Sequence, residues 1–147
     1  MRSPDELSVL FRARGLKITP QRQCIFRVLH GNVGHPTAER VYEEAAREMP
    51  SLSLKTVYQT LHELADLGEV ELLDLGTGAT RVDPNRSGAH HHLVCQRCGK
   101  VRDVSLDLPA LVVPEADRQG YVIGAAEIIF RGWCEVCADT ATFPPLS

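Results

Sequence analysis

The stretch SLKTVYQTLHELADLG, residues 53–68, decides the fold together with VELLDLGTGATRVD, residues 70–83, which follows it. Ser53 can cap a helix at its N-terminus, and Gly68 can end that helix as the residue just beyond its last turn. The second stretch contains two short β-type runs around a glycine-rich turn, which predicts a hairpin. A hairpin that directly follows helices indicates a winged helix-turn-helix unit.

The helix expected over 53–68 has two different faces. Its apolar face is formed by Leu54, Val57, Leu61 and Leu64. Its second face is polar, aromatic and basic, and it is formed by Lys55, Tyr58, Gln59 and His62. Such a face suits the base edges and phosphates of a DNA major groove, although an ordinary solvated face has the same composition.

Helix signals also precede this stretch. Thr19 followed by Pro20 predicts a helix start, and Thr37 predicts another that Pro50 ends. A short helix is expected over 5–14. Cys24 falls on the apolar face of the helix that starts at Pro20, so we expect it to pack as a small hydrophobe.

Composition and charge indicate a globular chain with one basic region. The 147 residues are 44% hydrophobic and 24% charged, with a net charge of −3. Leu7 to His35 nevertheless carries basic residues and no acid, and a local basic face matters more for phosphate binding than the overall balance. No apolar run approaches the roughly 18–20 residues of a membrane span, and the start lacks a secretion signal. We therefore expect a soluble, cytoplasmic protein.

The second half predicts a separate small α/β unit. The turn-rich DPNRSG, residues 83–88, suits a hinge at about 83–89, which divides the chain into 1–84 and 85–147. Short β-type runs follow in HLVC, KVRDV, YVI and EIIF, with a short helix near 109–118. A unit of about 60 residues has a marginal core, so a metal or dimerisation is expected to support it. The fold class is thus α+β, with a winged helix-turn-helix domain and a small α/β dimerisation domain.

Four of the five cysteines form two C-x-x-C pairs. Cys95 and Cys98 make the first pair, Cys134 and Cys137 the second, and 35 residues separate them. Two such pairs can present four thiolates to one tetrahedral Zn²⁺ that closes the small unit. A redox disulfide pair and unliganded thiols are the alternatives.

Histidines and acids suggest a second metal site. His90 and His92 point the same way if residues 90–95 form a strand, and His91 points away. Three further residues could complete a site with these two imidazoles: His35, Asp83 and Asp103. Nitrogen and carboxylate donors suit Fe²⁺, Mn²⁺ or Zn²⁺. Taken singly, a histidine such as His35 before a proline is more often a loop or capping residue, and an aspartate such as Asp83 before a proline is more often a turn residue.

Several motifs together resemble the ferric uptake regulator (Fur) family over nearly the whole chain. They are KITPQR (17–22), GHPTAERVY (34–42), SLKTVYQTL (53–61), the turn GTG (76–78), HHHLVCQRCGKV (90–101) and the closing C-x-x-C. The resemblance implies a homodimeric, metal-dependent repressor that binds a palindromic double-stranded DNA operator and is not an enzyme.

The resemblance also implies which residues act. The structural zinc, one per subunit, would be held by Cys95, Cys98, Cys134 and Cys137. One regulatory Fe²⁺ or Mn²⁺ per subunit would be held by His35, Asp83, His90, His92 and Asp103. Independently of the resemblance, the basic region, the polar helix face and the wing lead us to expect DNA contacts from Arg14, Lys17, Arg22, Lys55, Thr56, Tyr58, Gln59 and Arg81.

The sequence also bears on which type of sensor within the family the chain resembles. An aspartate at 103 looks most like the peroxide-sensing branch, in which oxidation of a ligand histidine ends repression; His35 and His90 are the candidates here. Gln59 stands where the family often has arginine, and the spacing from Asp83 to His90 is one residue longer than in some peroxide sensors. The alternatives are an iron, manganese, zinc or nickel uptake regulator, a constitutive zinc-stabilised DNA-binding protein, a thiol switch at Cys24 and, distantly, a metal-dependent hydrolase.

Overall fold

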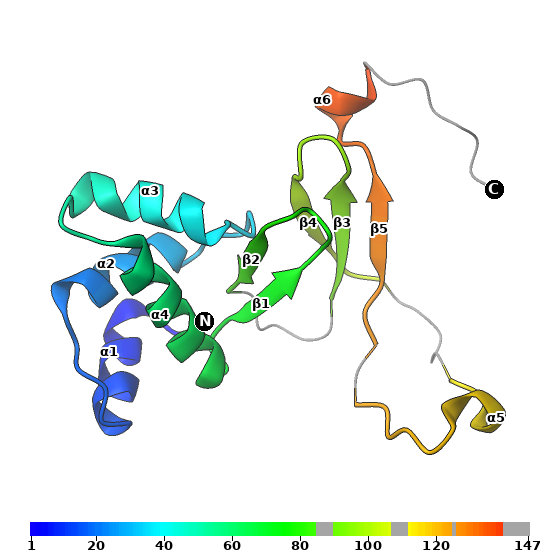
Figure 1. The fold of residues 1–147 in the computed structure, drawn as a ribbon, viewed down its shortest axis with the longest axis horizontal. Helices are drawn as coiled ribbons and strands as arrows, with labels where there is room; N and C mark the ends of the chain where they lie inside the picture. The colour runs from blue at the N-terminus through cyan, green and yellow to red at the C-terminus, as the bar shows by residue number, and fades with distance from the viewer. Residues whose placement is uncertain (85–89, 107–111, 125, 140–147) are drawn as a thin grey trace. The chain divides into compact units, whose positions relative to one another are not determined.

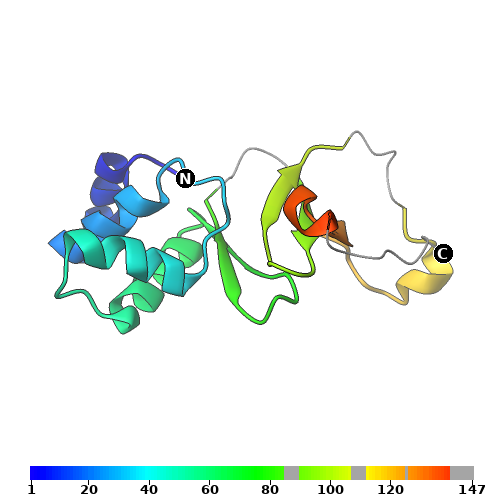
Figure 2. The same cartoon turned by 90° about the horizontal axis from the view of Figure 1, so that it is seen from above.

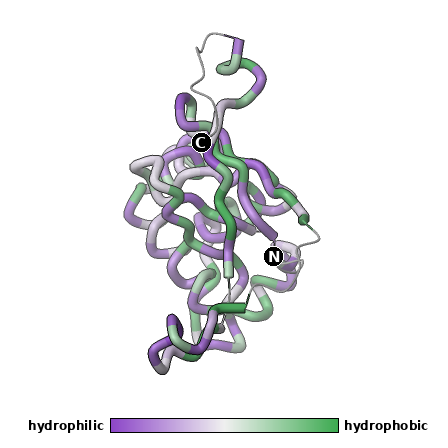
Figure 3. Tube along the Cα trace, turned by 90° about the vertical axis from the view of Figure 1, so that its right-hand side faces the viewer, coloured by the Kyte–Doolittle hydropathy of each residue, from purple (hydrophilic) through white to green (hydrophobic). Residues whose placement is uncertain are grey.

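The computed structural model describes residues 1–84, 90–106, 112–124 and 126–139 (Figure 1). The chain divides into two compact units, Met1–Arg86 and Ser87–Ser147. Most of the hinge expected at 83–89 lies outside the described residues, so its position stays a prediction. Figure 3 shows hydrophilic and hydrophobic residues interspersed along the trace. No helix in the described ranges has the length and apolar character that crossing a bilayer requires.

The first unit places helices before a hairpin, as the sequence predicts. Its described elements are α1 (Pro4–Ala13), α2 (Pro20–Leu29), α3 (Ala38–Glu48), α4 (Leu54–Asp66), β1 (Glu71–Asp74) and β2 (Thr80–Asp83). The predicted caps Thr19, Thr37 and Ser53 each accept a hydrogen bond from the backbone N–H three residues later. Gly68 follows α4 with φ +68°, a left-handed conformation that glycine adopts without steric cost.

One apolar core holds the first unit together. Helices α2, α3 and α4 pack against one another, and α1 packs on α2 (Figures 1 and 2). The Phe11 and Phe26 rings meet edge to face with centroids 5.0 Å apart. Val82 brings β2 into the same core. Cys24 is fully buried there, as expected for a packing residue.

The second unit is built on a three-stranded sheet in the order β4-β3-β5. Its described elements are β3 (His91–Cys95), β4 (Val101–Val104), α5 (Glu115–Arg118), β5 (Ile129–Gly132) and α6 (Glu135–Ala138). The central strand β3 pairs antiparallel with β4 and parallel with β5. The predicted fold class, a winged helix-turn-helix arrangement followed by a small α/β unit, is confirmed.

Three local expectations need correction. Leu54 is exposed although it was expected on the buried face of α4, because it is the first residue of the helix and lies beyond the packed turns. Residues 121–123 form no strand, and their side chains are exposed; no described strand pairs with them. The helix expected near 109–118 is the short α5, and residues 109–111 of that expectation lie outside the described residues.

Candidate metal centres and nucleic-acid interface

The four paired cysteines converge in the second unit. Each offers a sulfur, and these four Sγ atoms lie within 4.8 Å of one another. All four are free thiols, and Cys98 Sγ is 3.7 Å from Cys134 Sγ. A tetrahedral site with Zn–S bonds of about 2.3 Å separates its sulfurs by about 3.8 Å. The cluster therefore has the dimensions of a closed tetrahedral thiolate site.

Strand pairing brings the two cysteine pairs together. Cys95 ends β3, and its register partner on β5 is Gly132, two residues before Cys134. The first pair lies in a tight turn in which Gly99 N–H donates to Cys95 O at 2.9 Å. The second opens α6, where Cys137 N–H donates to Cys134 O at 2.9 Å. A parallel β3–β5 pair is thus what converts two distant sequence motifs into one cluster.

Backbone amides and burial give the thiols different acidities. Hydrogen bonds from the backbone N–H groups of Cys98 and Cys134 lower the pKa of Cys95 to about 6. Burial and the neighbouring sulfurs raise the pKa of Cys137 to about 12. A divalent cation bound by the four sulfurs would favour the thiolate form of each, because thiolates are the ligating species.

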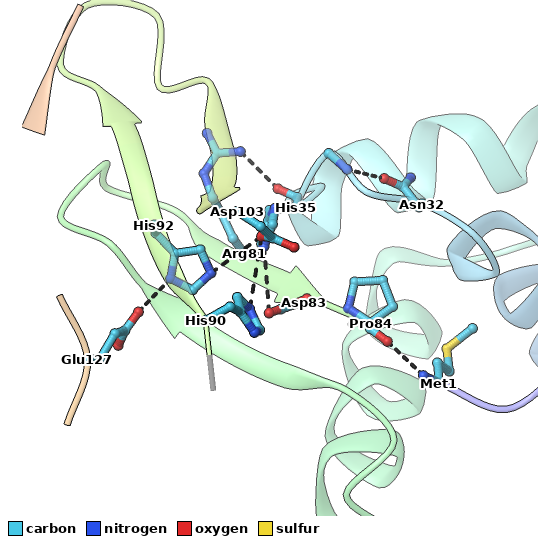
Figure 4. Close-up of polar contacts among 11 residues, drawn as sticks. Met1, Asn32, His35, Arg81, Asp83, Pro84, His90, His92, Asp103 and Glu127 are labelled. Carbon is cyan, nitrogen blue, oxygen red and sulfur yellow. Dashed lines mark hydrogen bonds and ion pairs between the residues drawn. The ribbon is translucent and has the colours of Figure 1, made fainter. Parts of the chain in front are cut away.

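His90, His92 and Asp103 form a second cluster, also within the second unit (Figure 4). His92 and Asp103 are register partners on β3 and β4, so their side chains share one face of the sheet. Asp103 Oδ1 is 3.9 Å from His90 Nε2 and 3.8 Å from His92 Nε2. The two imidazole rings are 5.0 Å apart between centroids. Such spacings are too long for hydrogen bonds and suit donors that share a cation.

Glu127 joins this cluster and was missed by the sequence analysis. Its Oε1 lies 2.6 Å from His92 Nδ1 (Figure 4). Glu127 precedes β5 and stands 35 positions from His92 in sequence, so no spacing motif connects the two residues. Only the parallel pairing of β3 with β5 could have indicated the contact.

His91 has a different environment from its neighbours. It is buried, and its Nδ1 accepts a hydrogen bond from the backbone N–H of Ile128 at 3.1 Å. The alternation expected for a strand places it away from His90 and His92. His91 therefore helps to hold β5 against β3.

His35 and Asp83 form a buried pair within the first unit. Both side chains are 1% exposed, and His35 Nε2 lies 3.6 Å from Asp83 Oδ2. His35 has φ +47°, a left-handed conformation that non-glycine residues adopt rarely and at an energetic cost. Arg81 donates to the His35 carbonyl at 2.9 Å, and Val82 N–H donates to Pro36 O at 2.9 Å. The hairpin strand β2 thus carries Asp83 and also fixes the loop that presents His35.

The polar face of α4 is present and accessible. Lys55, Gln59 and His62 are exposed. Gln59 Nε2 donates to Glu63 Oε1 at 3.2 Å, and Thr56 Oγ1 is 2.9 Å from Ser53 Oγ at the helix start. Arg14 and Lys17 are exposed between α1 and α2. These positions leave basic and amide groups available on the first unit.

Tyr58 has an acidic neighbour on that face. Its hydroxyl donates to Glu39 Oε1 at 2.6 Å, which raises the pKa of Tyr58 and lowers the pKa of Glu39. The contact joins the exposed face of α4 to the start of α3 and limits the rotamers of Tyr58.

Two arginines expected at DNA also have partners within the unit. Arg22 is 2.6 Å from Glu63, donates to the Lys17 carbonyl, and places its guanidinium carbon 5.5 Å from the centre of the Phe11 ring. Arg81 holds the His35 carbonyl, as described above. Their expected contacts with DNA stay predictions.

Sequence comparison identifies relatives. The profile of the ferric uptake regulator family matches residues 13–128. The peroxide-responsive repressor PerR of Staphylococcus epidermidis is 37% identical over 99 residues, which is 67% of this chain and 65% of that protein. PerR of Staphylococcus aureus strain Mu50 is also 37% identical over 99 residues, covering 67% and 66% of the two chains. The aligned region thus spans slightly less than two thirds of these relatives.

Solved structures show the same fold. Helicobacter pylori Fur, described as having three functional metal binding sites, superposes with a TM-score of 0.70 at 20% identity, covering 91% of this chain and 90% of that one. Vibrio cholerae Fur gives a TM-score of 0.68 at 26% identity, covering 87% and 99%. PerR from Streptococcus pyogenes gives 0.53 at 26% identity, covering 93% and 94%. The profile match and the identity to PerR proteins together show that this chain belongs to the ferric uptake regulator family.

Proposed function

We propose that this protein is a metal-dependent transcriptional repressor whose operator binding ends when its regulatory site is oxidised by peroxide. Two clusters of nitrogen and oxygen donors carry the proposal. The first unit contributes His35 and Asp83. The second unit contributes His90, His92 and Asp103. The 37% identity to peroxide-responsive repressors supports the same reading.

The proposed regulatory ion, Fe²⁺ or Mn²⁺, takes ligands from both groups. An ion that binds only one arrangement of two units stabilises that arrangement by mass action. Here it would couple the loop held by β2 in the first unit to the sheet of the second. Bound Fe²⁺ would supply the reactivity toward peroxide, and His35 and His90 are the proposed sites of oxidation. Loss of one imidazole ligand would weaken metal binding, so the metal would no longer stabilise the arrangement of the units that binds DNA.

The four-cysteine cluster is proposed to hold a structural Zn²⁺, one per subunit. Its all-sulfur donor set differs from the nitrogen and oxygen donors of the regulatory groups, so the two sites would select different metals. A closed tetrahedral site has no open position and contributes folding energy rather than reactivity. Proposed in this way, the chain is a binding protein and not an enzyme.

Double-stranded DNA is the proposed partner, contacted by a homodimer at a palindromic operator in the cytoplasm. The exposed face of α4 would lie in the major groove, with Lys55, Thr56, Tyr58 and Gln59 toward the bases and phosphates. Arg14 and Lys17 are exposed near the start of α2 and are proposed to contact phosphates. Arg22 and Arg81 are proposed phosphate contacts that would first have to leave some of their present partners.

A selection experiment tests the proposal. Zinc-containing protein is incubated with a pool of random-sequence DNA duplexes, with and without Mn²⁺, and retained duplexes are sequenced. We expect Mn²⁺-dependent retention of a palindromic sequence, because DNA binding requires the metal-stabilised arrangement. His90→Ala should lose this retention, whereas His30→Ala, an exposed histidine outside both groups, should keep it.

The outcome also separates the alternatives. Retention that is equal with and without Mn²⁺ would contradict the regulatory site and favour a constitutive DNA-binding protein. Retention that needs metal, and that persists when the protein is loaded with Fe²⁺ instead of Mn²⁺ and treated with peroxide, would favour an uptake regulator of the same family. Turnover of ester or phosphate substrates would instead favour the metal-dependent hydrolase.

A further inference from the structure

Glu127 makes a contact that the proposed function does not use. Its Oε1 is 2.6 Å from His92 Nδ1, which is hydrogen-bond distance. His92 Nε2, on the other side of the ring, is 3.8 Å from Asp103 Oδ1. The imidazole is therefore flanked by one carboxylate in hydrogen-bond contact and another at a distance typical of a shared cation.

The sheet register explains this placement. His92 sits on the central strand, opposite Asp103 on β4 and Ile129 on β5. Glu127 is two residues before Ile129, so it continues the same face of β5. His92 N–H donates to Ile128 O at 3.1 Å, and Ile128 N–H donates to His91 Nδ1 at 3.1 Å. These bonds anchor the backbone beside Glu127 to the strand that carries the histidines.

We propose that Glu127 is a positioning residue for His92, which holds the imidazole with its proton on Nδ1 and its Nε2 available to the regulatory metal. A carboxylate only accepts hydrogen bonds, so the 2.6 Å contact places the shared proton on Nδ1. The tautomer of a histidine is set by the bond that its other nitrogen makes. Carboxylates that contact metal-bound histidines in this way fix ring orientation and raise ligand basicity.

Exposure distinguishes Glu127 from a core residue. Its side chain is 40% exposed, whereas that of His92 is 3% exposed. Removing the carboxylate therefore leaves no buried cavity, and the fold should tolerate the change. Glu115 offers a matched control, because it is an exposed glutamate of the same unit whose carboxylate pairs with Arg118 at 3.4 Å.

The inference rests on the proposed regulatory site, so the experiment measures two independent quantities in the full zinc-containing chain. The first is the tautomer of His92, read from ¹⁵N chemical shifts of the histidine side chains without Mn²⁺ and assigned with His92→Asn. The second is the dissociation constant for Mn²⁺. The variants are E127A, E127Q and the control E115A.

We expect wild type and E115A to show His92 protonated on Nδ1, and E127A to lose that preference. E127A should bind Mn²⁺ about 10- to 100-fold more weakly. E127Q should keep the Nδ1 proton and most of the affinity, since its amide oxygen can still accept the bond. A direct ligand role for Glu127 would instead make E127Q as weak as E127A while it retained the Nδ1 proton, which would overturn a positioning role.

The two measurements distinguish a wrong role for Glu127 from a wrong regulatory site. If wild type binds Mn²⁺ but E127A keeps both the tautomer and the affinity, the positioning role is wrong and the regulatory site stands. If E127A loses the tautomer with unchanged Mn²⁺ affinity, the positioning role is also wrong. If wild type itself binds no Mn²⁺, the regulatory site fails and the inference fails with it.

Discussion

The two units differ in what holds them together. The first buries a continuous apolar cluster contributed by all four helices and by the hairpin. The described part of the second buries few apolar side chains, and many of its large hydrophobic residues are exposed in the single chain; among them are Leu93, Tyr121, Val122, Phe130 and Trp133. The first unit can thus be stabilised by apolar burial, whereas the described part of the second has little apolar burial, so we expect the proposed zinc site to contribute most of its stability.

Loss of the proposed zinc site should give the largest effect, because the described part of the second unit buries few apolar side chains. We expect Cys95→Ser to lose zinc together with hydrogen-exchange protection in β3, β4 and β5, while α1 to α4 stay protected. The apparent free energy of binding of a structural zinc is about 10–16 kcal/mol in zinc-finger peptides, and this energy is coupled to folding. Metal content and hydrogen exchange by mass spectrometry measure the two quantities.

Cys24→Ala is the control for this change. Cys24 lies in the core of the first unit, outside the cluster, and burial raises its pKa. The variant should keep its zinc and the protection of the second unit. A Cys95→Ser protein that stays folded in the second unit without zinc would contradict the structural role of the metal.

A core substitution should sharpen the same comparison. Leu61 is 1% exposed in the first unit, and Leu93 is 44% exposed on β3 of the second. We expect Leu61→Ala to lower the free energy of unfolding of the first unit by about 2–5 kcal/mol, because it leaves a cavity. Leu93→Ala should lower the free energy of unfolding of the second unit by well under half that amount when the sample is monomeric. Urea unfolding followed by site-resolved hydrogen exchange checks both values, and equal losses would contradict the difference between the units.

A small effect is expected at the surface of the first unit. The hydrogen bond from Tyr58 lowers the pKa of Glu39 from 4.5, so this carboxylate stabilises the fold above that pH and loses its contribution as the pH falls through the lowered value. Tyr58→Phe should return the pKa of Glu39 toward 4.5. NMR titration of the Glu39 carboxyl carbon measures it. An unchanged pKa would mean that the hydroxyl does not donate to Glu39 in solution.

Sequence reasoning succeeded where the signals are local. Thr19, Thr37 and Ser53 precede apolar-periodic runs, and the bond that each accepts lies within one turn of chain. The glycine turn at 76–78 likewise predicts its own hairpin, since two short runs flank it directly. The paired cysteines could be recognised because each pair has a metal-ligand spacing of its own.

Prediction from the sequence failed where a residue's structure depends on contacts with residues far away in the chain. Glu127 contacts His92 only because β5 pairs parallel to β3, and parallel pairing leaves no short-range pattern. Residues 121–123 have strand-like composition, but no described strand lies beside them to complete a ladder. Leu54 has the right periodicity for burial, yet its position at the start of α4 leaves it uncovered.

The central claim is that peroxide is sensed through the regulatory metal, and one measurement tests it most directly. Zinc-containing protein is loaded with Fe²⁺ without oxygen, treated with a small excess of peroxide and mapped by peptide mass spectrometry, with Mn²⁺-loaded protein as the control. We expect one added oxygen on His35 or on the peptide carrying His90 and His92, absent from the control. Unmodified histidines would contradict it, and oxidation confined to Cys24 would indicate a thiol switch.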